Sequence, residues 1–246
     1  MRTTLLFCSF SLITPLLVAQ RSPDHGFGIR GHAFGASKAP ITGAPYSGVE
    51  TKQTQQLLAN GNQINHSEQS NVYRDSQGRM RTERTVTPPA SSGKASFTEV
   101  TLFDPVAGYR YEWSTASTTA FQSPLPPPHT GGGTRPLPPA NPNVTTANLG
   151  TQTVNGVSAT GTQVTETIPA GAFGNVQPIQ VVRTTWISTD LKIPVEIKIT
   201  DPRFGTRDLE VTSIVEAEPA AALFVVPSGY TIQTGHGGFP GPGHPK

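Results

Sequence analysis

Short runs in which apolar and polar residues alternate, with turn sequences between them, constrain the fold of this chain most strongly. In residues 193–200 every second side chain is aliphatic, and proline, glutamate, lysine and threonine stand between. A period of two places one set of side chains on a buried sheet face and the other in water. Residues 109–113 and 208–212 repeat the pattern. Turn sequences separate these runs, at 60–62, 75–78, 155–156 and 201–205. This order favours consecutive antiparallel strands joined by tight turns.

The composition also agrees with a sheet rather than with helices. Only 14% of the residues are charged, and the chain holds 25 glycines and 24 prolines. The first expected strands, near 49–55 and around Ile64, are rich in Gln, Asn, Ser and Thr, so at least one sheet face should be wet. We therefore predict an all-β fold, a curved antiparallel sheet or half-barrel that is only partly covered. The formal net charge of +2 predicts no nucleic-acid partner.

The first twenty residues have the layout of a secretory signal peptide. A positive start, Met1-Arg2, precedes a mostly apolar run over 5–18 and a small-residue exit near Ala19 or Gln20. The run is shorter than the roughly 20 apolar residues of a membrane span, so we expect no transmembrane segment in the mature chain. The only cysteine, Cys8, lies inside the run and would leave with it. A chain exported without disulfides suggests a bacterial periplasmic or secreted protein.

The remainder divides into one foldable domain and three segments of biased composition. Residues 46–234 are expected to form a single β domain. A disordered arm over 21–45 precedes it, a Pro-rich loop over 124–143 interrupts it, and a Gly/Pro-rich tail over 235–246 follows it.

Motifs that could carry catalysis lack the context that their chemistry needs. Residues 26–31 match G-x-G-x-x-G, but no strand precedes them and no helix follows. Residues 91–94 contain S-x-x-K in what reads as a hairpin loop rather than at a helix start. Of the six histidines, only His66 falls in an expected strand. We therefore predict a non-enzymatic protein without a metal site or cofactor.

Aromatic and aliphatic side chains on the expected strands are candidates for a ligand-binding wall. Its predicted members are Tyr109, Tyr111, Trp113, Trp186, Val195 and Ile197. Such residues can line a cavity for an apolar ligand, and plain core packing is the alternative.

Four arginines around one expected hairpin could form a patch for an anionic group. They are Arg74, Arg79, Arg81 and Arg84. Asp75 and Glu83 lie among them, so a solvated strand face of mixed charge is the alternative.

Several segments, taken in order over about 46–232, resemble the fold of LolA-like periplasmic lipoprotein carriers. They are residues 73–81 (YRDSQGRMR), 104–111 (DPVAGYRY), 150–157 (GTQTVNGV), 186–195 (WISTDLKIPV) and 223–230 (LFVVPSGY). The chain is similar also to uncharacterised exported proteins of soil bacteria. The LolA resemblance implies a strongly curved antiparallel half-barrel whose apolar concave face takes acyl chains. Carriers of that family cover this face with helices, and this sequence offers the Pro-rich loop in their place.

These observations lead to two functional hypotheses. In the first, the chain is an exported, non-enzymatic envelope protein that binds a hydrophobic or amphipathic ligand, such as a lipid or a lipoprotein acyl chain, on a concave sheet. In the second, it is a structural or protein-interaction component of the envelope. Its partner, another envelope protein, would then dock on the Pro-rich loop or on a sheet edge by main-chain pairing.

Overall fold

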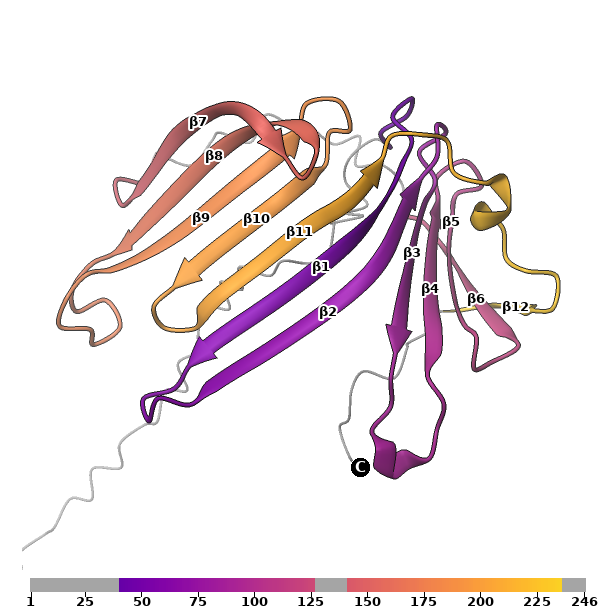
Figure 1. The fold of residues 1–246 in the computed structure, drawn as a ribbon, viewed down its shortest axis with the longest axis horizontal. Coiled ribbons are helices and arrows are strands. Elements are labelled where there is room, and N and C mark those ends of the chain that lie inside the picture. Colours follow the sequence, from indigo (N-terminus) through magenta and orange to yellow (C-terminus); the bar gives the residue numbers. More distant parts are fainter. Residues whose placement is uncertain (1–39, 127–140, 236–246) are drawn as a thin grey trace, which may run out of the picture. The chain divides into compact units, whose positions relative to one another are not determined.

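The computed structural model describes residues 40–126 and 141–235, and these residues form one twelve-stranded sheet (Figure 1). The strands are β1 (Tyr46–Leu57), β2 (Gln63–Arg74), β3 (Met80–Val86), β4 (Phe97–Asp104), β5 (Tyr109–Ser114), β6 (Thr119–Pro124), β7 (Val144–Val154), β8 (Val157–Ile168), β9 (Ile179–Ser188), β10 (Pro194–Asp201), β11 (Gly205–Val215) and β12 (Thr231–Thr234). Helical structure among the described residues is limited to two 3₁₀ turns, η1 (Ala90–Ser92) and η2 (Ala221–Phe224).

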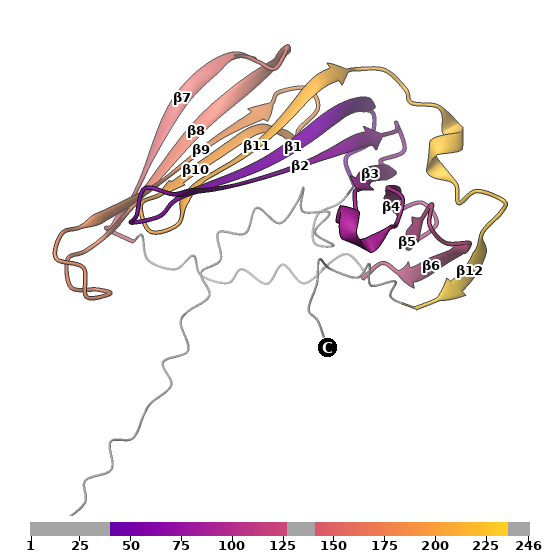
Figure 2. The same ribbon diagram turned by 60° about the horizontal axis from the view of Figure 1, so that its bottom comes forward.

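The strand order across the sheet is β12-β6-β5-β4-β3-β2-β1-β11-β10-β9-β8-β7. The two end strands do not pair with each other, so the sheet is open, and Figure 2 shows that it curves. The predicted all-β class, a curved sheet or half-barrel, is thus confirmed. One pairing differs from the antiparallel prediction, because β12 runs parallel to β6. The chain reaches β12 by crossing back from β11, and it therefore arrives in the direction of β6 rather than by a hairpin.

The turn sequences and the alternating runs occupy the places that the sequence predicts. Asn155 and Gly156, with φ of 51° and 89°, form the two-residue turn between β7 and β8. On β10, Val195, Ile197 and Ile199 are buried, as their alternation indicates. The first strands along the chain are partly exposed to water, as their polar sequence predicts, since the residues of β2 from Gln63 to His66 are all exposed.

Strand register defines two faces of this sheet, because directly paired residues lie on the same side. The successive pairs that start at Trp113 are Trp113–Val100, Val100–Glu83, Glu83–Asn71 and Asn71–Val49. Thr51, two residues beyond Val49, continues the row through the pairs Thr51–Glu210, Glu210–Glu196 and Glu196–Trp186. Both tryptophans therefore lie on one side, which we call the tryptophan face. Ile197 pairs with Leu209 on the other side, the isoleucine face.

A segment without regular strand structure joins β11 to β12 and contains η2 (Figure 2). We call residues 216–230 the C-terminal strap. It connects β11, which borders β1, to β12, which borders β6 at the far end of the sheet. It lies on the tryptophan face, because its Phe224 packs in one cluster with Trp113. Within the described residues, η2 packs against β3.

Several predicted segments lie partly or wholly outside the described residues. The signal peptide and residues 21–39 of the arm do, as do residues 127–140 of the Pro-rich loop and 236–246 of the tail. Residues 40–45 belong to the described part, where the Gly43 N–H donates a hydrogen bond to the Ser76 carbonyl oxygen at 2.9 Å. Across residues 40–126 and 141–235, no helix has the length and apolar character needed to span a bilayer.

Candidate ligand-binding site

An apolar cluster between the tryptophan face and the C-terminal strap is the best-defined candidate site. The sheet contributes Val100, Leu102, Trp113 and Ala120, with Tyr73 and Tyr111 partly buried beside them. The strap contributes Phe224, flanked by Leu223, Val226 and Tyr230. Leu102 pairs directly with Tyr111, and Val100 with Trp113, so cross-strand pairs supply the floor of the cluster.

The aromatic row on β5 changes from buried to exposed along the strand. Trp113 is 2% exposed, Tyr111 is half-buried and Tyr109 is 38% exposed. The rings of Tyr109 and Tyr111 are 6.2 Å apart between centroids, and the Tyr111 Oη accepts a hydrogen bond from Gln122 Nε2 at 3.3 Å. Burial raises the pKa of the Tyr111 hydroxyl above its ordinary value. The row forms an aromatic strip that is open at its Tyr109 end.

Polar contacts fasten the strap over the buried end of this row. Arg81 Nη1 donates a hydrogen bond to the Leu223 carbonyl oxygen at 2.8 Å, and its guanidinium lies 5.1 Å from the Trp113 ring centre. Tyr230 Oη donates to the Ser114 carbonyl oxygen at 3.1 Å, and its ring packs edge-on against Trp113. At the other end of the strap, the Glu218 carboxylate accepts hydrogen bonds from the Ser76 backbone N–H at 3.0 and 3.2 Å.

The six predicted wall residues do not meet in one place. Tyr109, Tyr111 and Trp113 share β5, whereas Trp186 lies on the same face on β9, with six strands between the two. Trp186 packs over Gly161, where an added Cβ would come within 2.6 Å of its ring. Ile197 lies on the isoleucine face, and Val195 stands at a bulge of β10 next to it. Both aliphatic side chains are buried.

The four predicted anion-binding arginines are also divided and already have partners. Arg79 and Arg81 pair with Asp75 and Glu83 at 2.6 Å each, and Arg84 pairs with Glu99 and Glu68. Register places Arg81 on the tryptophan face and Arg84 on the isoleucine face. Burial alone would lower the pKa of Arg84, but its two glutamates outweigh that effect and raise it.

Arg74 is buried and ties separate segments together. Its Nε and Nη2 donate to the Ala44 carbonyl oxygen at 2.8 and 2.6 Å, and Nη2 also donates to the Leu191 carbonyl oxygen at 2.7 Å. The guanidinium lies 5.0 Å from the Tyr46 ring centre, and burial lowers its pKa. These contacts join the residues before β1 to the β9–β10 loop.

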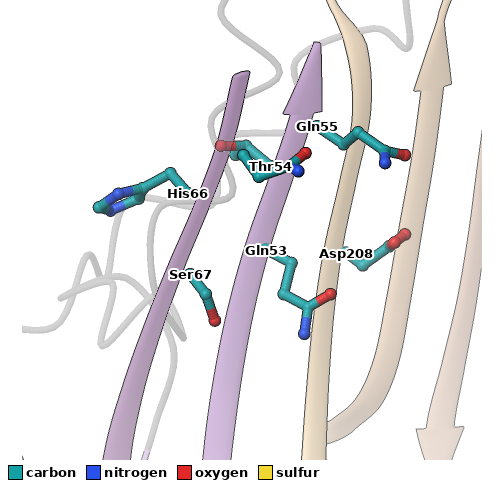
Figure 3. Close-up of a pocket in the computed structure, with 7 residues that line it drawn as sticks. Gln53, Thr54, Gln55, His66, Ser67 and Asp208 are labelled. Carbon is teal, nitrogen blue, oxygen red and sulfur yellow. The ribbon is translucent and has the colours of Figure 1, made fainter. Parts of the chain in front are cut away.

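A polar hollow of about 400 Å³ lies elsewhere, over β1, β2 and β11 (Figure 3). It is lined by Gln53, Thr54, Gln55, Asn65, His66, Ser67 and Asp208. Amide and hydroxyl groups of this kind suit polar ligands rather than acyl chains. Within residues 40–126 and 141–235, no three His, Cys, Asp or Glu side chains gather as metal ligands would.

The C-terminal strap belongs to the candidate site, although none of its residues is among the predicted site residues. The signal was present in Leu223–Tyr230, which begins with four consecutive apolar residues and ends in a tyrosine. The sequence could not show that this segment returns over β5, because that contact joins residues more than a hundred positions apart.

Comparisons with known proteins identify related folds but no family. No protein-family model and no curated protein matches the chain. Among solved structures, it is similar to one of the Pseudomonas aeruginosa MucA/MucB complex, with 13% identity and a TM-score of 0.42, covering 78% of this chain and 59% of that one. It is also similar to a LolA superfamily protein from Nitrosomonas europaea, with 8% identity and a TM-score of 0.32 over 76% of this chain and 92% of that one. The lipoprotein LppX of Mycobacterium tuberculosis gives 16% identity and a TM-score of 0.28, over 72% and 90%.

These similarities concern the fold alone. A putative outer membrane lipoprotein-sorting protein domain from Vibrio parahaemolyticus is also among the similar structures, with 8% identity and a TM-score of 0.25 over 73% of this chain and 88% of that one. The chain spans only 59% of the MucA/MucB chain that it matches.

Proposed function

We propose that this protein is an exported, non-enzymatic component of the bacterial envelope that binds a hydrophobic or amphipathic ligand along Tyr109, Tyr111 and Trp113. One observation carries the proposal: the aromatic row runs from exposed Tyr109 to buried Trp113, and the strap covers only its buried end. An apolar chain could lie on the open tyrosines and extend beneath the strap.

The chemistry of this strip fits an apolar chain better than a polar ligand. Tyrosine and tryptophan rings offer large apolar surfaces with polar tips at the rim. Val100 and Leu102, paired with Trp113 and Tyr111, are buried beside them and would join this surface where a ligand displaces side chains of the strap. Each methylene removed from water contributes about 0.8 kcal/mol, so a chain of a few carbons can compete with the strap side chains.

The other predicted wall positions serve as controls under this proposal. Trp186 is separated from the row by six intervening strands, and Ile197 belongs to the opposite face. Substitutions at these two positions should leave binding unchanged unless they unfold the sheet.

Native mass spectrometry of the full chain, expressed with its own leader and purified from a bacterial periplasm without detergent, tests the proposal. The expected result is an added mass that organic solvent releases as a lipid. An unliganded mass that persists after incubation with a lipid extract would overturn the proposal.

The two tryptophans allow the site to be located by fluorescence. The Trp186→Phe variant keeps Trp113 as its single tryptophan, and Trp113→Phe keeps Trp186. A long-chain fatty acid as probe should shift the emission of Trp113 and leave that of Trp186 unchanged. Tyr109→Ala should weaken binding about tenfold through lost contact area. Ile187→Ala, which also removes an exposed apolar side chain but on β9, should not.

A further inference from the structure

Strand β7 is an open edge of unusual length and composition. It forms one end of the sheet and pairs only with β8 among the described strands. All its residues except Val154 are exposed. The opposite edge, β12, has only four residues.

Most of the features that protect natural sheet edges are missing from β7. Edges are normally blunted by lysines, prolines, bulges, short length or a covering segment. The sequence VTTANLGTQTV contains no charged residue and no proline over eleven residues. One bulge, at Asn148–Gly150, divides the edge into two straight runs. Its Gly150 has a φ of 77° and donates its N–H to Asn148 Oδ1 at 2.8 Å.

The tight turn after β7 determines which backbone groups face outward. A two-residue turn is closed by a hydrogen bond between its flanking residues, so Val154 and Val157 form a hydrogen-bonded pair. Such pairs alternate along an antiparallel ladder. Thr153 and Thr151 therefore direct their N–H and C=O groups away from β8, toward the open edge.

We propose that this edge pairs antiparallel with the same strand of a second copy of the chain. The two outward residues stand symmetrically about Gln152, so a two-fold axis through Gln152 sets Thr151 of each copy opposite Thr153 of the other. Both pairs then exchange backbone hydrogen bonds, and the two Gln152 residues face each other as a non-hydrogen-bonded pair.

The charge distribution favours a second copy as the occupant. When a strand pairs with the same strand of a second copy, like charges on the two strands lie close together and repel, and β7 carries no charged residue. The formal net charge of the chain is only +2, so long-range repulsion between copies is weak. An edge contact of this length buries little surface, and the dimer should therefore be weak and dependent on concentration. This surface is independent of the aromatic row, so the failure of one proposal leaves the other standing.

A pair of charge variants tests both the partner and the register. In Thr151→Lys/Thr153→Lys, the proposed axis sets lysine opposite lysine twice, and the dimer should weaken at least about tenfold at low salt. In Thr151→Lys/Thr153→Glu the same axis sets lysine opposite glutamate twice, and the dimer should persist or tighten. Sedimentation velocity over a concentration series measures both, and added salt should reduce the difference between them.

Cross-linking gives a second measurement. In a Cys8→Ser background, Gln152→Cys places two thiols across the axis, with Cα atoms about 4.5 Å apart, a separation that a disulfide can bridge. This variant should cross-link on mild oxidation, whereas Thr160→Cys on β8 should not. Three results would each overturn the proposal: a wild-type chain that stays monomeric at about millimolar concentration, equal association of the two charge variants, or no cross-link at position 152.

Discussion

The two tryptophans lie on the same face of one sheet, yet they are buried in different ways. Trp113 is covered by another part of the chain, since the strap supplies Tyr230 and its neighbours. Trp186 instead finds space within its own neighbourhood, because the strand beside it carries glycine at the directly paired position, Gly161. A large ring can thus be buried either by a segment distant in the sequence or by packing over a glycine on the neighbouring strand.

This difference has consequences for stability and for binding. The environment of Trp113 depends on contacts between residues far apart in the sequence, which can open as a unit. The environment of Trp186 depends on the register of two neighbouring strands, β8 and β9. The covered half is therefore the place where a ligand could replace protein contacts, and the half around Trp186 should behave as a fixed scaffold.

The largest effect is expected at Trp113. Trp113→Ala removes the centre of the covered cluster and should lower the free energy of unfolding by about 3–5 kcal/mol, while Trp113→Phe should cost less because a ring remains. Urea unfolding followed by circular dichroism gives both values. Equal losses for the two variants would show that the volume of the ring does not support the strap.

The glycine beneath Trp186 should give the next largest effect. In Gly161→Ala the new Cβ would lie 2.6 Å from the indole, and overpacking of this kind typically costs about 1–3 kcal/mol. In a Trp186→Ala background the same change should cost nothing or stabilise, because the ring is gone and alanine suits a strand better than glycine does.

A double-mutant cycle on thermal unfolding measures this change of sign. Gly229→Ala serves as control, since an added Cβ there meets nothing within 4 Å. Additive costs at positions 161 and 186 would contradict the account of how Trp186 is buried.

The fastening of the strap predicts a smaller effect. Glu218→Ala removes the hydrogen bonds to Ser76 and should cost about 0.5–1.5 kcal/mol. Glu216→Ala, at an exposed position two residues earlier, should cost almost nothing. Amide exchange at Thr231, whose N–H bonds to the Thr118 carbonyl oxygen, should accelerate only in the first variant. Unchanged exchange there would mean that Glu218 does not hold the strap.

The elements of the sheet could be predicted from the sequence because their signals are local. Alternation in residues 193–200 and the Asn155-Gly156 turn depend only on neighbouring residues, and β10 and the β7–β8 hairpin appear where expected. The candidate site was harder to predict from the sequence. Whether Trp113 and Ile197 share a face depends on the summed register of the intervening strands, and a shift of one residue in any pair would reverse the answer. The contact between the strap and β5 also could not be predicted locally, because it depends on how the chain returns across the sheet after β11.

The smallest prediction concerns pH and a pair of glutamates on the tryptophan face, at strands that the strap does not reach. Glu196 on β10 pairs directly with Glu210 on β11, and partial burial together with this like charge raises the pKa of the Glu196 carboxyl. Ionisation of Glu196 is therefore less favourable in the folded chain than in the unfolded one, and the folded state binds more protons between the ordinary and the raised pKa. The contribution of this group to stability accordingly falls as the pH rises through that interval.

Glu196→Gln should remove this dependence. The variant should be slightly more stable than the wild type at pH 7, by less than about 1 kcal/mol because water screens the pair, and the two should converge near pH 4. Urea titrations at a series of pH values measure the difference, with Glu216→Gln as an exposed control. A gain that persisted unchanged at pH 4 would show that the substitution acts through packing. In that case, repulsion between Glu196 and Glu210 would not be what makes the stability of this partly exposed region depend on pH.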